Sequence, residues 1–382
     1  MATKNNKSKR RKPLTKKEQQ KRKMMIVGAE IACLLVLLVV VFVWSFVGKI
    51  DFNSFKEEDA GINSDLSAES KEILDQYTNV AFFGLDTREG NYKSANSDVI
   101  MIASIKNDTK EVKLVSVYRD TVLHIGDDKY TKANSAYAKG GPERAVQMLN
   151  SNLDLNIKEY VCVDFLALVD VIDALGGVEI EITQQEAEIV NSMLWEYEEI
   201  SGKKLDEYGY IWEYGVQNLT GPQATAYARI RSTAGDDFKR TSRQRIVLEA
   251  MLNKAKQSDI STLLDICEVV FDDISTSLSL TEIMDLAKDV KAYTIVSTSG
   301  FPFDMTAPKI EGIGSCVVPI SLENNVAQLY AYLFGAEGYV CSETVQFTSD
   351  YITEITGVKL GDSGINTDSY NNTAGQDGTV FD

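Results

Sequence analysis

Residues 98–118, DVIMIASIKNDTKEVKLVSVY, decide the fold of this chain. Residues 98–105 and 111–118 are runs rich in β-branched and other apolar side chains, separated by the polar sequence KNDTK. Such runs on either side of turn-forming residues predict two strands. Because five residues cannot carry a crossover helix, we expect the two strands to pair as an antiparallel hairpin.

Strand and helix patterns alternate on both sides of this hairpin. Residues 79–85, NVAFFGL, predict a strand before it, and strands are predicted after it at 160–163, at 178–182 resuming the sheet, and late at 291–298 and 315–320. Helices are predicted at residues 143–153, 165–175, 184–205, from Gly221, 240–256, 261–271, 281–290 and 324–334. Alternation of this kind predicts an α/β fold, and the hairpin makes its sheet mixed.

The first 75 residues predict a membrane anchor. Residues 1–23 contain eleven Lys and Arg and one acid, and residues 24–48 are apolar almost throughout. A long apolar run after a basic segment predicts one transmembrane helix with a cytoplasmic N-terminus, and we prefer this to a signal peptide because no cleavage site follows. Polar residues 49–75 predict an extracellular tether. The protein is therefore expected in the cell membrane, single-pass, with its main domain outside.

Charge and residue usage exclude several function classes. The net charge is −17 although the N-terminal tail is basic, so the remainder is too acidic for a general nucleic-acid binder. The single histidine, His124, lies in the apolar run VLHI and is interpreted as structural, which argues against a Ser-His-Asp triad or a histidine metal site. The cysteines match no zinc pattern, and a Cys316–Cys341 bridge stays open.

Arginine is concentrated in residues 227–245, YARIRSTAGDDFKRTSRQR, which hold five of the eight arginines that follow residue 23. A guanidinium group is a planar fork of donors that suits phosphate oxygens. If YARIR is extended, Arg229 and Arg231 share a face, whereas Arg240 and Arg243 share a helix face with Gln244 beside it. The alternative is a solvated basic helix face, and Arg245 in particular is assigned to it.

Three acids border predicted strands: Asp86 after the first strand, Asp98 at the start of the second, and Asp120 after the third. Paired carboxylates at strand ends can hold Mg²⁺, which takes phosphate oxygens as further ligands. Each acid alone could equally be a turn residue or a helix cap. Together with Arg119 and the arginine stretch, they predict a Mg²⁺–pyrophosphate site.

Residues 78–255 contain, in order, GLDTREGN, SDVIMIASI, VSVYRDT, KANSAYAKGGPERAV, VDFLALVDVIDALGGVEIEI and LTGPQATAYARIRSTAGDDFKRTSRQRIVL. This set resembles the LytR-CpsA-Psr family of cell-envelope glycopolymer phosphotransferases, and it is specific because several separate motifs occur without a large gap. The resemblance implies an α-β-α sandwich with a hydrophobic pocket for a lipid tail. It also implies transfer of a glycopolymer (teichoic acid, capsule or a similar chain) from a polyisoprenyl-pyrophosphate carrier onto a peptidoglycan hydroxyl.

By motif match, the resemblance assigns roles to individual residues. It implies that Asp86 and Asp98 hold Mg²⁺, with Mn²⁺ as an alternative. It implies the catalytic residues Arg119, Asp120, Arg229 and Arg231. It implies the pyrophosphate-binding residues Arg119, Lys132, Arg229, Arg231, Arg240, Arg243 and Gln244. Asn96 stands where family members often have arginine, which removes one phosphate contact.

The expected organisation is a basic cytoplasmic tail (1–23), a membrane anchor (24–48), a tether (49–75), a catalytic domain (76–340) and a polar, disordered tail (341–382). The expected partners are the lipid-linked glycopolymer, the peptidoglycan acceptor and the membrane, without nucleic acid. Two other functions remain open. With water as acceptor the same residues would make a polyisoprenyl-pyrophosphate phosphatase, and without chemistry the protein would be an envelope lipid- or polymer-binding regulator.

Overall fold

A computed structural model of the chain describes residues 51–52, 57–85, 95–201, 209–231, 236–258, 274–279, 282–283, 285–286 and 289–365. All of them belong to the second of two units, Met1–Lys49 and Ile50–Asp382. Within these ranges, no helix is long and apolar enough to cross a bilayer. The membrane anchor predicted for residues 24–48 and the helix predicted at 261–271 lie outside the described residues.

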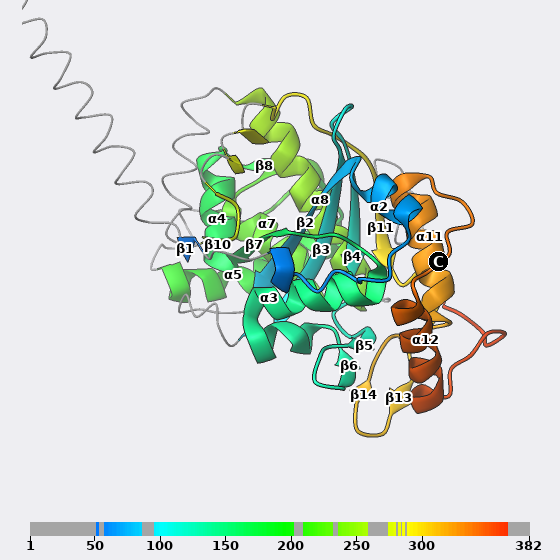
Figure 1. Ribbon diagram of the computed structural model, residues 1–382. Helices are drawn as coiled ribbons and strands as arrows, with labels where there is room; N and C mark the ends of the chain where they lie inside the picture. The colour runs from blue at the N-terminus through cyan, green and yellow to red at the C-terminus, as the bar shows by residue number, and fades with distance from the viewer. Residues whose placement is uncertain are drawn as a thin grey trace, which may run out of the picture. The chain divides into compact units, whose positions relative to one another are not determined.

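A seven-stranded mixed sheet forms the centre of the second unit (Figure 1). Its strands, in spatial order, are β1 (Asp51–Phe52), β10 (Ile274–Thr276), β7 (Glu159–Asp164), β2 (Tyr77–Leu85), β3 (Ser97–Lys106), β4 (Glu111–Val117) and β11 (Thr294–Phe301). Strands β2, β3 and β4 pair antiparallel, whereas β7 and β11 pair in parallel with β2 and β4. The predicted hairpin and the mixed α/β sheet are therefore confirmed.

Helices cover both faces of this sheet. Along β3, Ile100 and Ile102 join the large core cluster that includes helix α3 (Asn134–Leu153), whereas Met101 joins a second cluster with residues of α8 (Asp236–Gln257). The alternation follows from the period of two of a strand, whose successive side chains point to opposite faces. Figure 1 shows α3 and α8 on opposite sides of the central strands.

A third cluster of buried residues joins α4 (Phe165–Ala174), α5 (Gln184–Ser201) and α7 (Gly221–Arg229) to a separate two-stranded sheet. The prediction that residues 178–182 resume the central sheet is wrong, because β8 (Val178–Ile182) pairs only with β9 (Gly215–Leu219). The chain turns away at Gly176 and Gly177, which both have positive φ. A Cβ at Gly177 would lie 2.5 Å from the Asn218 side chain, so the turn requires glycine there.

The expected tether is partly folded. Residues 57–75 contain a short 3₁₀ helix (Glu57–Asp59) and α2 (Ala68–Leu74), and Leu66 and Leu74 belong to the main core. The prediction that residues 49–75 form a tether is therefore wrong for residues 57–75, because two buried leucines fix this stretch to the domain.

The C-terminal part is also more ordered than its composition indicates. Helix α12 (Glu343–Thr356) packs against α11 (Leu322–Phe334) and α3, so the prediction of a disordered tail from residue 341 is wrong for this stretch. Its N-cap is Ser342, and its buried residues include Val345 and Ile352, which the polar sequence around them conceals. Residues 366–382 lie outside the described residues.

The remaining strands form small pairs beside the sheet: β5 (Val122–His124) with β6 (Tyr130–Lys132), β12 (Met305–Thr306) with β15 (Val318–Pro319), and β13 (Lys309–Ile310) with β14 (Gly314–Ser315). The run predicted as a late strand at 315–320 thus contains the end of β14 and β15, and both pair outside the central sheet. Cys316 and Cys341 are buried free thiols, and their Sγ atoms donate to the carbonyls of Pro308 and Glu323, so they form no bridge.

Helix α3 begins nine residues before its predicted start at Glu143. Gly140 and Gly141 have non-helical φ and ψ, and Pro142 follows them, so the helix is kinked there. The sequence pattern identified only the second half because the two glycines and the proline are typical of a helix start.

Candidate functional site

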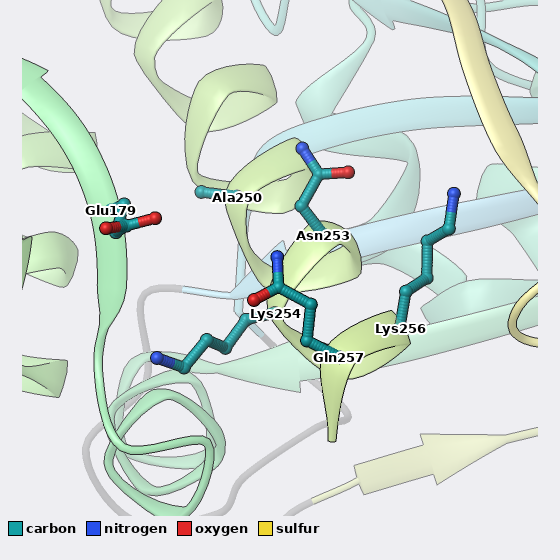
Figure 2. A pocket seen from close by; sticks show the side chains of 6 residues that line it. All are labelled: Glu179, Ala250, Asn253, Lys254, Lys256 and Gln257. Atoms are coloured by element: carbon teal, nitrogen blue, oxygen red, sulfur yellow. The ribbon is translucent and has the colours of Figure 1, made fainter. Parts of the chain in front are cut away.

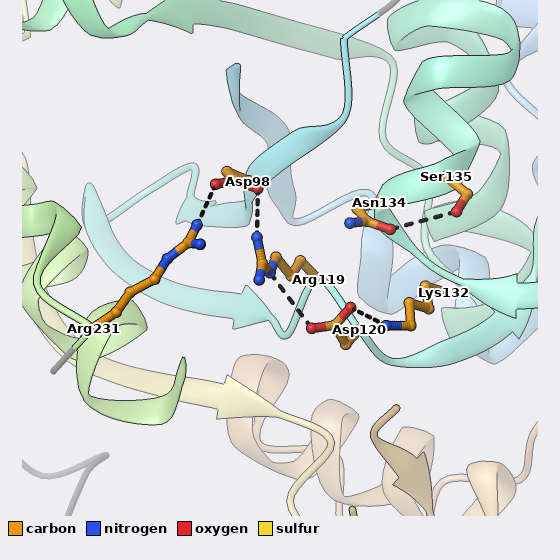
Figure 3. Close-up of polar contacts among 7 residues, drawn as sticks. All are labelled: Asp98, Arg119, Asp120, Lys132, Asn134, Ser135 and Arg231. Atoms are coloured by element: carbon orange, nitrogen blue, oxygen red, sulfur yellow. Dashed lines mark hydrogen bonds and ion pairs between the residues drawn. The ribbon is translucent and has the colours of Figure 1, made fainter. Parts of the chain in front are cut away.

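The carboxylate of Asp98 binds two guanidinium groups (Figure 3). Arg119 Nη1 lies 2.7 Å from Oδ1, and Arg231 Nη2 lies 2.8 Å from Oδ2. Asp98 and Arg119 are largely shielded from solvent, whereas half of the Arg231 side chain is exposed. Charge-assisted hydrogen bonds of this length are among the stronger polar contacts in proteins.

A second carboxylate continues this arrangement. Asp120 Oδ1 lies 3.0 Å from Lys132 Nζ, and its Oδ2 lies 3.5 Å from Arg119 Nε. Figure 3 shows the resulting row, in which Arg231, Asp98, Arg119, Asp120 and Lys132 alternate in charge. Three cations share two anions, so the row carries an excess of one positive charge and can accept an anion.

Strand register explains why Asp98 and Arg119 meet. In the β3–β4 pair, Met101 lies opposite Ser116 and Ile102 opposite Val115. Continuing this antiparallel register by three residues places Arg119, just after β4, opposite Asp98 at the start of β3. Lys132 arrives through the neighbouring pair, where it lies opposite Val122. Antiparallel pairing of segments that are close in sequence thus brings together four of the five residues.

Arg231 comes from a segment 133 residues after Asp98. Helix α7 ends at Arg229, and Ile230 is buried with φ −53° and ψ 125°, which takes the chain out of the helix. YARIR is therefore not extended, and the condition under which both arginines would share a face is not met. Because the helix ends between them, Arg229 and Arg231 contact different partners.

Arg229 is held by helix α5. Its Nη1 lies 3.1 Å from Glu196 Oε2 and 3.2 Å from Tyr197 Oη, and its guanidinium lies over the ring of Phe165 at 4.9 Å. Burial acts to lower the pKa of Arg229, but Tyr197 and Glu196 oppose this effect and the net pKa is raised. Arg229 is thus a charged, oriented side chain. Its partners on α5 are not predictable from the sequence pattern.

The Arg229 cluster borders the same edge of the sheet as Asp98. Phe165 directly follows Asp164, which lies opposite Leu85 in the β7–β2 pair, and Leu85 lies opposite Ser97 in the β2–β3 pair. Adjacent strands are about 4.8 Å apart, so β7 and β3 are separated by roughly 10 Å. This edge therefore brings the Arg229 cluster and the Asp98 row into one neighbourhood.

The arginines of α8 are more buried than sequence analysis predicts. Arg243 Nε lies 2.8 Å from Glu186 Oε1, and its guanidinium lies over the ring of Tyr227. Arg240 and Arg245 are 3% and 2% exposed, and Gln244 is half-buried. The assignment of Arg245 to a solvated helix face is wrong, and burial lowers the pKa of its guanidinium. Arg240, Arg243 and Gln244 as phosphate ligands stay a prediction.

Of the two predicted metal ligands, only Asp98 belongs to the described residues. Asp86 lies outside the described residues, and within the described ranges no group of three or more His, Cys, Asp or Glu side chains could hold a metal ion. Asp98 has the oxygen donors that Mg²⁺ prefers. Both of its oxygens are engaged by guanidinium groups, so a cation at Asp98 requires at least one arginine to turn away. The donor chemistry fits Mg²⁺ under that condition.

A pocket of about 360 Å³ lies elsewhere, between β8 and the end of α8 (Figure 2). It is lined by Glu179, Ala250, Asn253, Lys254, Lys256 and Gln257. Lys256 Nζ donates to the carbonyl of Tyr293 at 2.9 Å. The lining contains none of the predicted site residues, so this pocket is distinct from the Asp98 row.

Comparisons with known proteins give a family match and several relatives. A family model described as the LytR_cpsA_psr family matches residues 46–322. The chain is 27% identical over 247 residues to the polyisoprenyl-teichoic acid–peptidoglycan teichoic acid transferase TagV of Bacillus subtilis, covering 63% of this chain and 60% of that protein. It is 30% identical over 217 residues to the corresponding transferase TagU of Enterococcus faecalis, covering 56% and 65%. The match thus spans less than two thirds of either relative.

Among solved structures, protein gbs0355 from Streptococcus agalactiae has the same fold. The TM-score is 0.58 at 21% identity, and the match covers 75% of this chain and 97% of that one.

Proposed function

The chain belongs to the LytR_cpsA_psr family, and we propose that it is a membrane-anchored phosphotransferase of cell-wall assembly. In this proposal it moves a glycopolymer, such as teichoic acid or capsule, from a polyisoprenyl-pyrophosphate carrier onto peptidoglycan. The names of its relatives TagV and TagU describe a transfer of this kind. The observation that carries the proposal is the convergence of Arg119 and Arg231 on Asp98, two guanidinium groups from distant segments at one sheet edge.

The reaction requires that a new phosphodiester bond to the acceptor replaces the phosphoanhydride bond of the carrier's pyrophosphate. An acceptor hydroxyl oxygen attacks the sugar-linked phosphorus, the bond from that phosphorus to the bridging oxygen breaks, and polyisoprenyl phosphate leaves while the hydroxyl proton passes to a base or to water. Such transfers depend on positioning and on neutralising phosphate charge more than on covalent help from the protein. Arg119, Arg231 and Arg229 supply positive charge, and Lys132 adds another through its contact with Asp120.

Arg119 and Arg231 can exchange one anion for another. In this structure their guanidinium groups bind the Asp98 carboxylate, and pyrophosphate oxygens offer the same charge and geometry. Asp120 lies 3.5 Å from Arg119 Nε and keeps this side chain oriented when its other nitrogens turn to the substrate. Asp98 and Asp120 are also the described carboxylates nearest to these cations that could receive the hydroxyl proton.

Asp98, together with Asp86, would hold Mg²⁺ or Mn²⁺ in this proposal. Bound there, the ion would neutralise charge on the pyrophosphate oxygens. The remaining parts of the proposal rest on the sequence: residues 24–48 anchor the chain, residues 1–23 face the cytoplasm, and the domain from Ile50 works outside the cell.

Product analysis tests the proposal. The full chain in detergent micelles receives an oligosaccharide linked to polyisoprenyl pyrophosphate, with and without peptidoglycan fragments, in Mg²⁺ or in EDTA. We expect polyisoprenyl phosphate release and a sugar phosphodiester on the peptidoglycan only when Mg²⁺ is present. Free sugar phosphate in place of the peptidoglycan product would identify a phosphatase. No turnover of the lipid under any condition would leave a binding protein.

A further inference from the structure

Four aromatic side chains near the candidate site are exposed to solvent: Trp195, Tyr210, Trp212 and Tyr214, with exposed fractions of 56%, 42%, 83% and 66%. We call this group the aromatic ledge. Trp195 lies on α5, and the other three lie in the segment that leads into β9. Several large apolar rings exposed in one region indicate an interaction site, because such rings are unfavourable in water unless a partner covers them.

The segment that carries three of these rings is fixed to the domain. Asn191 of α5 binds both backbone groups of Ile211, donating to its carbonyl and accepting from its N–H at 2.9 Å each. Ile211 itself is 8% exposed and packs in the core of this region. Gln223 of α7 donates to the carbonyl of Gly209 at 3.1 Å. The rings on either side of Ile211 are therefore held outward by a rigid backbone, and the Tyr210 and Trp212 centroids are 5.6 Å apart.

The aromatic ledge adjoins the arginine site. Trp195 lies one helical turn after Asn191 on α5, so it is on the same side of that helix as the anchor of the segment. The residue after Trp195 is Glu196, which holds Arg229. Gln223, the second anchor, precedes Arg229 by six residues on α7, which corresponds to about 9 Å along the helix. A ligand that extends over a distance of this order can contact the ledge and the arginine site together.

The charge of this region restricts the partner. Residues 178–201 and 209–219 contain several glutamates and no lysine or arginine, and the two lysines between these ranges, Lys203 and Lys204, lie outside the described residues. An anionic membrane surface, a polyphosphate backbone and nucleic acid all require cations and are disfavoured here. Beside Trp195, the exposed stripe of α5 consists of Gln185, Glu188 and Ser192, which offer hydrogen-bond donors and acceptors.

We propose that the aromatic ledge binds an uncharged glycan strand and presents it to the arginine site as the acceptor. The C–H face of a pyranose ring is apolar and packs flat on indole and phenol rings, while its rim hydroxyls and amides need hydrogen-bonding groups of the kind found on α5. Rigid aromatic side chains lose little conformational freedom on binding, which favours such contacts. This role as acceptor subsite rests on the proposed function, whereas the glycan binding itself can be measured without any turnover.

The probe is a soluble, neutral oligomer of β-1,4-linked N-acetylglucosamine. Its binding to the full chain in non-ionic micelles is measured by calorimetry for the wild type and for Trp212→Ala, Tyr214→Ala and Phe347→Ala. Phe347 on α12 is 67% exposed and serves as a matched control outside the ledge. We expect Trp212→Ala and Tyr214→Ala each to weaken binding by about tenfold or more, which is ~1.4 kcal/mol, and Phe347→Ala to leave it unchanged.

Two other readouts separate this proposal from the function on which it rests. Trp212→Ala should raise the KM for the glycan acceptor while leaving the KM for the lipid-linked substrate unchanged. Complete absence of turnover with intact, ledge-dependent glycan binding would overturn the proposed function alone. Absence of glycan binding, or equal binding by Trp212→Ala, would overturn the ledge proposal.

A membrane role is the competing outcome. The full chain is reconstituted in phosphatidylcholine vesicles, and quenching by aqueous acrylamide is compared between the wild type and Trp212→Phe to isolate the Trp212 signal. We expect Trp212 to stay accessible. Shielding of Trp212 in vesicles would assign the ledge to the bilayer interface and overturn glycan binding as its role.

Discussion

Asp98 and Arg119 face each other across the open end of the β3–β4 hairpin, with Asp98 Oδ1 2.7 Å from Arg119 Nη1. Arg231 binds the other oxygen of the same carboxylate at 2.8 Å. Asp98 therefore brings two guanidinium groups from different segments together, and a substrate phosphate that takes the place of the carboxylate finds both donors nearby. This preorganisation reduces the cost of ordering the cations at the moment of reaction.

Removing either guanidinium group should slow turnover strongly. We expect Arg119→Ala and Arg231→Ala each to reduce kcat/KM by about 10²-fold or more, because each removes charge stabilisation of the transferring phosphoryl group. Arg231→Lys should recover only part of this loss, since lysine lacks the planar fork. Steady-state release of polyisoprenyl phosphate measures these effects.

Arg144→Ala is the matched control for these variants. Arg144 is also ion-paired, with Asp127 at 2.6 Å, and it donates to the backbone carbonyl of Ile125. Arg144 makes none of the contacts of the candidate site, so the turnover of Arg144→Ala should remain within about twofold of the wild type. Wild-type turnover in Arg119→Ala or Arg231→Ala would contradict the assignment of the Asp98 row.

Glu196 should act by positioning Arg229. In Glu196→Gln the side chain keeps a hydrogen-bond acceptor but carries no charge. Arg229 is therefore oriented less strictly, and the pKa of its guanidinium is raised less. We expect a loss of about tenfold in kcat/KM, smaller than the loss in Arg229→Ala. Glu354→Gln, an exposed glutamate on α12 outside both sites, provides the control. Equal turnover of Glu196→Gln and the wild type would show that Tyr197 and Phe165 are enough to orient Arg229.

Local sequence patterns predict part of this site. The hairpin Asp98–Arg119 is predictable because an antiparallel register relates residues close in sequence, and the concentration of arginine in residues 227–245 indicates that Arg231 has a specific role. The partners of Arg229 and Arg243 are not predictable, because Glu196 and Glu186 meet them only when α5 packs on α7 and α8. In the sequence, Glu186 and Glu196 have the pattern of an ordinary solvated helix face.

Burial is the second feature that local patterns miss. Arg245 is 2% exposed although a guanidinium in a basic helix normally reaches water. The segments 57–75 and 343–356 have polar composition, and a few apolar residues, such as Leu66, Leu74 and Ile352, decide that they pack onto the domain. Tertiary contacts of single residues in polar segments carry no periodic signal that a sequence window can detect.

Asp154 should be one of the residues on which the stability of the domain depends most. Its buried carboxylate accepts hydrogen bonds from Asn63 Nδ2 at 2.7 Å, from Ser342 N and Oγ at 2.8 and 2.6 Å, and from Tyr339 Oη at 3.1 Å. It thereby joins the segment before α2, the end of α3 and the start of α12. Asp154→Ala leaves these buried donors without their acceptor, and we expect a loss of about 3 kcal/mol or more in the free energy of unfolding.

Chemical denaturation of the full chain in micelles measures this loss. Asp127→Ala provides a control, because Asp127 is a largely exposed aspartate that also has positive φ and an ionic partner. Its effect should be below about 1 kcal/mol. A midpoint for Asp154→Ala equal to that of Asp127→Ala would show that water replaces the lost carboxylate.

His124 should make the stability of the domain depend on pH. Burial lowers the pKa of His124; Asp128 and Asp127 oppose this effect, and Arg144 adds to it. The imidazole packs on Tyr130, which packs on Tyr351 of α12, so protonation places a charge in a partly buried aromatic contact. The folded state therefore holds the proton less tightly than the unfolded state, whose histidine has a pKa of about 6.5.

The sign of the dependence follows from this difference. Above about pH 6.5 both states are neutral and the full stability is present, whereas below it the unfolded state takes up the proton first and stability falls until the pH reaches the lower folded-state pKa. Glu159, Asp164 and Glu249 have raised pKa values and stabilise the folded state as the pH falls, so the total curve mixes both signs. The difference between the wild type and His124→Gln isolates the histidine, because it is the only one in the chain. The midpoint at pH 5.5 minus the midpoint at pH 7.5 should be more positive in His124→Gln than in the wild type. An equal difference in the two proteins would show that His124 does not contribute.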